Sequence, residues 1–106
     1  MKTNRAAAIE PLPAEWLEKM ANALGVLAHP HRLRIIETLE ARAEAPVHEI
    51  MKALALPQAA VSHHLNRMKA AGIIASERRQ KEMWYRIADQ DSLTILNCIR
   101  KKKERT

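Results

Sequence analysis

Residues 46–72 read PVHEIMKALALPQAAVSHHLNRMKAAG, and this stretch decides the fold of the chain. Its pattern predicts two short helices joined by a tight turn at Leu56-Pro57. Such a pair is a helix-turn-helix, the arrangement in which the second helix enters a groove of DNA. We therefore interpret the rest of the chain as the scaffold that presents the second helix.

The second helix, residues 58–71, has two chemically different sides when its residues are placed at about 100° per residue. One side is a broad apolar arc that can face a core, formed by Ala60, Val61, His64, Leu65, Met68 and Ala71. The other side is polar and carries Gln58, Ser62, His63, Asn66, Arg67 and Lys69. From its place on the apolar arc, His64 is predicted to be a core histidine with a local hydrogen-bond partner.

The polar side is free of acids, since no Asp or Glu occurs between Lys52 and Ser76. A solvated helix face usually mixes both signs of charge, because opposite charges at i,i+4 stabilise the helix. An acid-free face instead suits phosphate, although an ordinary solvated face is the alternative. We predict base contacts from Gln58, Ser62, His63 and Asn66, and phosphate contacts from Arg67 and Lys69.

Length and composition limit the class of protein. The 106 residues suffice for one domain, and the apolar content of 47% with only 2 Gly favours a helical globular chain. A net charge of +6 favours a polyanionic partner, nucleic acid before an acidic membrane surface. The single cysteine, the lack of a signal-peptide pattern and the lack of a run of roughly 18 apolar residues predict a cytoplasmic protein.

Upstream of the motif, residues 1–13 are predicted to form a flexible arm and residues 14–28 a first helix. Another helix is predicted over residues 31–42, between the first helix and the motif, because Pro30 suits the first turn of a helix. We expect it to bury Leu33, Ile35, Ile36 and Leu39 and to expose Arg32, Arg34, Glu37 and Glu40. A short extended segment at residues 45–47 then leads into the motif.

Downstream of Gly72, a natural helix end, the pattern favours strands over residues 73–78 and 82–87. They flank Arg79-Gln80-Lys81 and predict a hairpin with a basic tip. Arg78, Arg79 and Lys81 are predicted to form a wing that contacts the minor groove or the DNA backbone, with a solvated turn as the alternative. With a last helix over residues 91–103, the fold is mostly α with a small β-hairpin: a winged helix-turn-helix of about five helices and a two-stranded wing.

Four segments of this chain, in order, resemble the ArsR/SmtB family of bacterial winged-helix repressors. They are Leu27–Ile36 (LAHPHRLRII), Gln58 with Ser62–Leu65 (SHHL), Ala70–Ile74 (AAGII) and Trp84–Ile87 (WYRI). The resemblance covers about residues 24–87. It implies a homodimer whose first and last helices form the interface, so that residues 14–106 form a DNA-binding and dimerisation domain. It also implies that two recognition helices read a palindromic operator in double-stranded DNA.

Members of the family sense their signal at metal or thiol sites. The resemblance implies two metal sites, and this chain departs from the family's pattern at both. The family's cysteine site falls on Val47–Met51, which contains no thiol. The family's second site falls on Asp89, Asp91, Lys102 and Arg105, where two cations replace metal ligands. We therefore predict no metal and no cofactor at the family's positions.

The remaining histidines and the lone cysteine are predicted as follows. His29 and His31 flank the turn at Pro30 and are interpreted as structural, while His48 would need ligands from elsewhere to bind zinc. Cys98 is interpreted as a small buried hydrophobe, with an intersubunit disulfide or a redox-modified thiol as the alternative.

The predicted function is that of a sequence-specific, dimeric transcriptional repressor. The alternatives are a non-specific nucleoid or architectural DNA binder, for which the positive charge would suffice, and a winged-helix module that docks proteins. An enzyme is not predicted, because no carboxylate pair, nucleophile-base pair or glycine-rich phosphate loop stands out.

Overall fold

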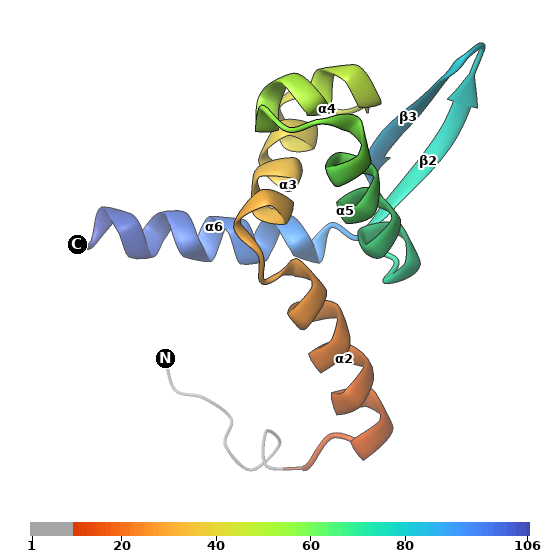
Figure 1. Ribbon diagram of the computed structural model, residues 1–106. Helices are drawn as coiled ribbons and strands as arrows, with labels where there is room; N and C mark the ends of the chain where they lie inside the picture. The colour runs from red at the N-terminus through yellow and green to blue at the C-terminus, as the bar shows by residue number, and fades with distance from the viewer. Residues whose placement is uncertain (1–9) are drawn as a thin grey trace.

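A computed structural model describes residues 10–106, so most of the arm predicted over residues 1–13 lies outside the described residues. Five helices and three strands follow one another in this part of the chain (Figure 1). In order they are α2 (Ala14–Leu27), α3 (Pro30–Arg42), β1 (Ala45–Pro46), α4 (Val47–Leu54), α5 (Gln58–Ala70), β2 (Ile74–Arg79), β3 (Glu82–Ile87) and α6 (Asp91–Glu104). The predicted winged helix-turn-helix is confirmed.

Aliphatic side chains from α3, α4 and α5 form the centre of the core, and the sheet and α6 close it. Ile35, Ile36, Ile50, Val61, Leu65 and Met68 are fully buried, as the helical periodicity predicted for α3 and α5. Tyr85 of β3 and Leu96 of α6 join the same cluster. The apolar arc of α5 therefore faces inward, and its polar face is left on the surface.

Arg32 departs from the sequence prediction. It was expected on the exposed side of α3, but its side chain is buried. Its guanidinium donates hydrogen bonds to Val26 O at 3.0 Å and to His64 Nδ1 at 3.0 Å. The prediction was wrong because α5 crosses this side of α3 and supplies an acceptor there.

The sheet has three antiparallel strands in the order β1-β3-β2, one more than the predicted wing. Ala45 and Pro46 were expected to be extended, and they pair with Tyr85 and Trp84 of β3. The hairpin itself turns at Gln80-Lys81, so Arg79 belongs to β2 rather than to the loop. The extra strand fixes the base of the wing to the body.

A left-handed glycine joins α5 to the wing. Gly72 has φ of +78°, its N–H donates to Lys69 O, and the N–H of Ile73 donates to Met68 O. This pair of bonds is a Schellman motif, which satisfies the last carbonyls of the helix. The chain can therefore leave α5 and enter β2 with only three residues, 71–73, between the two elements.

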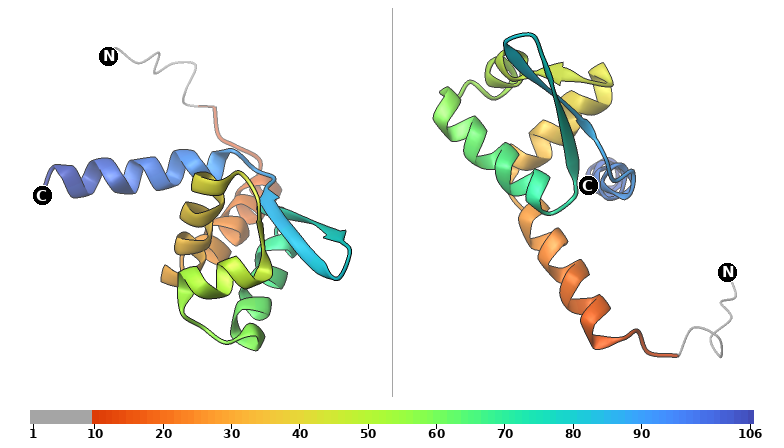
Figure 2. Two further views of the ribbon diagram at one scale, coloured as in Figure 1. Left: turned by 90° about the horizontal axis from the view of Figure 1, so that it is seen from above. Right: turned by 90° about the vertical axis from the view of Figure 1, so that its right-hand side faces the viewer.

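The first and last helices extend away from this body. Only the C-terminal end of α2 is buried. Figure 1 shows α2 and α6 leaving the body in different directions, and in the right-hand view of Figure 2 α6 is seen end-on while α2 runs away from the body. Large apolar side chains stay exposed on them, among them Trp16, Leu17, Leu24 and Ile99. Cys98 is also exposed, so its interpretation as a buried residue was wrong for the single chain.

Within residues 10–106, no helix combines the length and the apolar character that a membrane crossing requires.

Candidate nucleic-acid interface

The exposed face of α5 carries the residues predicted to contact DNA. Gln58, His63, Asn66, Arg67 and Lys69 are exposed, and Ser62 is half-buried beside the wing. The helix begins after Pro57, and no side chain caps its first N–H groups. A helix N-terminus of this kind attracts anions.

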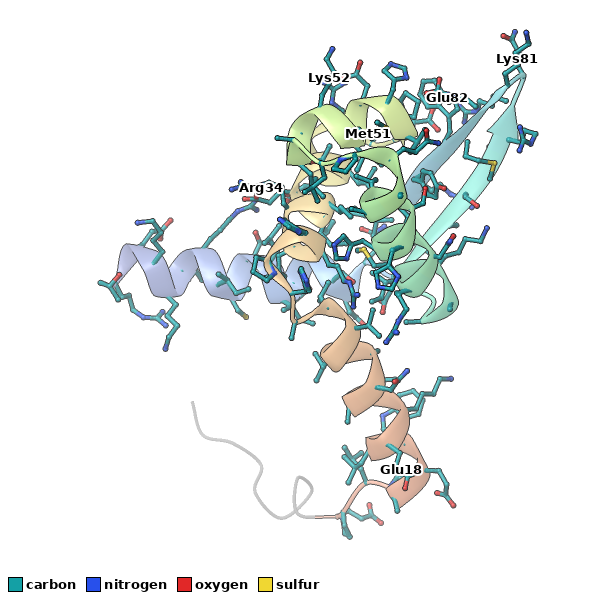
Figure 3. All side chains as sticks on the ribbon, viewed as in Figure 1. Glu18, Arg34, Met51, Lys52, Lys81 and Glu82 are labelled. Carbon is teal, nitrogen blue, oxygen red and sulfur yellow. The ribbon has the colours of Figure 1, made fainter. Side chains whose placement is uncertain are left out.

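The structure brings the start of α5 and the wing together around one hollow of about 190 Å³. Gln58 and Ser62 line it from α5, while Arg78 and Lys81 line it from the wing. Lys81 stands at the tip of the hairpin, away from the body (Figure 3). Four of the nine residues predicted to contact DNA therefore line one hollow. We call the polar face of α5 and the wing cations together the α5–wing surface; its residues are Gln58, Ser62, His63, Asn66, Arg67, Lys69, Arg78, Arg79 and Lys81.

The cations of the α5–wing surface differ in their partners. Among residues 10–106, no carboxylate forms a salt bridge with Arg67, Arg78 or Lys81. Lys69 Nζ donates a hydrogen bond to Ser76 Oγ at 2.8 Å, which links α5 to the base of β2. Within residues 10–106 none of these four side chains has a carboxylate partner, so phosphate could serve as their counter-charge.

Arg79, in contrast, is already paired. Its guanidinium donates to Glu44 at 3.0 and 2.6 Å and to Glu77 at 3.3 Å. Its Cζ also lies 4.8 Å from the centre of the Trp84 ring, within cation–π range. The sequence grouped Arg79 with the free cations because Glu44 is distant in the chain and its approach depends on the pairing of β1 with β3.

Acidification is expected to release Arg79 from Glu44. Hydrogen bonds from Arg79 hold the pKa of the Glu44 carboxyl below its ordinary value of 4.5. A carboxyl whose pKa is lowered by folding stabilises the fold above its unfolded pKa, and this contribution is lost as the pH falls through the folded-state pKa. An NMR acid titration of the Glu44 carboxyl carbon should give a lower midpoint in the native chain than in Arg79→Gln. Equal midpoints in the two proteins would contradict the pairing.

A second contact joins the wing to the helix-turn-helix. The ring of His48, at the start of α4, contacts Glu82 through Nδ1 and lies 3.3 Å from Glu49 through Nε2. The hydrogen bond from His48 lowers the pKa of Glu82. Both ring nitrogens of His48 therefore face carboxylates of this chain.

His64 has the role predicted for it, since it is buried on the inner side of α5 and accepts a hydrogen bond from Arg32. Its ring lies against those of His29 and His31, with ring centres 4.6 and 5.4 Å away. Burial is the main cause that lowers the pKa of both His64 and His29, and the Arg32 charge lowers both further. Three imidazoles from two distant segments thus meet at the α2–α3 turn. The sequence did not predict this cluster, because nothing in residues 29–31 or around His64 indicates that the two segments meet in the fold.

Comparisons with known proteins agree on one family. Residues 29–76 match the model described as "Bacterial regulatory protein, arsR family". The chain is 42% identical over 79 residues to the HTH-type transcriptional repressor SmtB of Mycobacterium tuberculosis, a match that covers 74% of this chain. The chain spans 58% of the length of that repressor.

A second relative and one solved structure match over more of their own lengths. The biofilm growth-associated repressor of Agrobacterium fabrum is 33% identical over 93 residues, which cover 84% of this chain and 77% of the relative. The structure is the homodimeric winged helix-turn-helix DNA-binding domain of Mb0332 from Mycobacterium bovis, described as a possible ArsR-family regulator. It is 25% identical and superposes with a TM-score of 0.73 over 97% of this chain and 88% of that chain. Both of these curated relatives are named as repressors. This chain belongs to the ArsR family of bacterial regulatory proteins.

Proposed function

We propose that this chain is a sequence-specific transcriptional repressor that binds a palindromic operator in double-stranded DNA as a homodimer. The observation that carries the proposal is the acid-free, exposed face of α5, which meets Arg78 and Lys81 of the wing around one hollow. Within residues 10–106, neither of these two cations has a carboxylate partner. Relatives named as repressors support the same function.

The α5–wing surface divides by chemistry into two kinds of contact. Amide, hydroxyl and imidazole groups of Gln58, Ser62, His63 and Asn66 match the donors and acceptors of base edges in the major groove. Arg67, Lys69, Arg78 and Lys81 provide charge for phosphates, and Arg79 would do so only after leaving its carboxylate partners. Base contacts then decide the sequence, and the cations supply affinity for any duplex.

The proposed dimer uses the apolar sides of α2 and α6. A hollow of about 310 Å³ between them is lined by Leu24, Leu27, Ala28, Leu33, Ile95 and Ile99. Leu24 is 51% exposed and Ile99 43% exposed in the single chain, which is a large apolar area to leave in water. The homodimeric state of the Mb0332 domain supports a second copy as the cover.

Fluorescence anisotropy tests the function directly. The duplex upstream of this protein's own gene is compared with a scrambled duplex at about 150 mM salt, and a preference on the order of a thousandfold is expected. Equal, weak binding to both duplexes, and no selected sequence from a random DNA pool, would favour a non-specific architectural binder. No binding to any duplex would favour a module that docks proteins.

The wing cations are expected to differ in their salt dependence. Replacing Lys81 with Ala removes an unpaired cation, so the slope of log K against log salt should fall in magnitude by about one. Arg79→Ala removes a cation that is already shared with Glu44 and Glu77, so its slope should change by less. Binding isotherms at four or more salt concentrations, with circular dichroism to confirm folding, measure both. A larger change for Arg79 than for Lys81 would show that DNA displaces the carboxylates.

A further inference from the structure

The three-histidine cluster at the α2–α3 turn lies outside the α5–wing surface and is not explained by DNA binding. His29 ends the turn after α2, His31 is in the first turn of α3, and His64 comes from the inner side of α5. One ring nitrogen of each lies within 4.8 Å of one nitrogen of each of the others. His64 is buried, and His29 and His31 are partly exposed, so the cluster has an open side toward solvent.

These distances suit a small transition-metal ion after a modest inward shift. Zinc binds imidazole nitrogen at about 2.0–2.1 Å, so two ligand nitrogens of a tetrahedral site are about 3.3 Å apart. Three imidazoles with one open position are a donor set that zinc and cobalt accept. The partly exposed rings of His29 and His31 could supply most of the movement, because His64 is fixed in the core.

Hydrogen bonds determine which nitrogen of each ring is available. His29 Nδ1 accepts from the backbone N–H of His31 at 3.1 Å, and His64 Nδ1 accepts from Arg32 Nε–H at 3.0 Å. In a neutral imidazole that accepts at Nδ1, the proton is on Nε2. The metal-free cluster therefore holds His29 and His64 as Nε2–H tautomers.

We propose that His29, His31 and His64 form a binding site for a divalent transition-metal ion of the zinc and cobalt class, and that occupancy of this site changes the seating of α5. For a metal to bind at Nε2 of His29 or His64, the Nε2 proton must first leave to solvent. The metal then takes the lone pair that this frees, and Nδ1 of the same ring takes up a proton from solvent. The number of bound protons stays the same. Nδ1–H of His29 then faces the backbone N–H of His31, and Nδ1–H of His64 faces Nε–H of Arg32. Two donors cannot bond to each other, so both hydrogen bonds are lost.

The loss of the Arg32 bond is the step that reaches DNA. This bond ties α3 to the inner side of α5, one residue from His63 on the predicted DNA-reading side. When it breaks, the Arg32 guanidinium is free to move away from the bound cation, and α5 is held through the metal instead. The metal site stands independently of the DNA-binding function, whereas its effect on DNA rests on the proposed function.

Cobalt titration of the full chain without DNA tests the site alone. One equivalent of Co²⁺ should bind with the intense visible bands of a tetrahedral ion, and Zn²⁺ should displace it. His31→Gln removes one ligand but leaves the hydrogen bonds of His29 Nδ1 and His64 Nδ1 in place. It should weaken metal binding on the order of a hundredfold, because even partners outside the ligand set contribute 10–100-fold.

His48→Gln is the matched control, since it removes an exposed histidine that faces two carboxylates. It should bind cobalt like the native chain. Equal binding by the native chain and His31→Gln, or loss of binding in His48→Gln instead, overturns the site. Unfolding curves of the metal-free variants confirm that each protein is folded before the titration.

Operator binding with and without Zn²⁺ then tests the coupling. Zinc should change the Kd for the operator between about fivefold and 150-fold in the native chain, and not in His31→Gln. An unchanged Kd with a saturated site would overturn the coupling. A chain that binds cobalt but no specific duplex would overturn the proposed function and leave the metal site standing.

Discussion

Replacing Leu24 with Glu is expected to convert the proposed dimer into a monomer and to lower operator affinity by about 10²- to 10⁴-fold. Leu24 lines the apolar hollow between α2 and α6 and is half exposed in the single chain. A carboxylate there would be buried without a partner in the dimer, but it remains in water in the monomer. A monomer engages one half-site, so it loses the gain that comes from linking two binding events.

The control for this prediction is Asn22→Glu, which places the same residue on an exposed position of the same helix. Sedimentation equilibrium should show a monomer for Leu24→Glu and a dimer for Asn22→Glu, with similar helix content in both. A Leu24→Glu protein that stays dimeric would show that the interface lies elsewhere. A monomer with native operator affinity would show that one recognition helix suffices.

Leu65→Ala is expected to lower the free energy of unfolding by about 3 kcal/mol, within the usual 2–5 kcal/mol for such truncations. The Leu65 side chain is fully buried on the inner side of α5, among the core residues of α3 and α4. Its truncation leaves a cavity that the helices cannot close without moving α5. This loss is a large part of the total stability of a domain of this size.

Leu65→Met is the matched variant, because it preserves volume and should cost less than about 1.5 kcal/mol. Urea unfolding at one fixed protein concentration compares the two, so that any dimer contribution is the same. A loss below about 1 kcal/mol for Leu65→Ala would mean that α5 is not seated by this residue. In that case the Leu65→Ala and Leu65→Met proteins should also bind DNA with the same affinity.

The helices of this fold could be predicted because their apolar residues recur at the three- and four-residue spacing of a helix. The buried side of α5 follows from apolar residues three and four apart, and Gly72 marks its end because only glycine adopts a left-handed conformation at low cost. The family then followed from short segments such as SHHL and AAGII. None of these inferences requires knowledge of which elements meet in space.

Apart from Cys98, which is exposed in the single chain, the errors involve contacts between distant segments. Arg32 has the sequence surroundings of an exposed residue, and only the position of α5 makes it buried. Glu44 gives no local sign that it pairs with Arg79, because that contact depends on β1 joining the sheet. The approach of His29 and His31 to His64 is of the same kind. The base and phosphate contacts of α5 and the wing stay predictions.

The corner at Gly72 has a consequence for the kind of duplex that this protein would accept. The Schellman bonds, the contact from Lys69 to Ser76 and the contact from His48 to Glu82 fix the wing to the helix-turn-helix at three places. We therefore expect the separation between α5 and the hairpin tip to change little when DNA binds. Groove width and bendability vary with base sequence, including at steps that no side chain touches. With α5 and the wing held at one separation, the protein would favour operators in which the bases that it does not touch already give the required groove spacing.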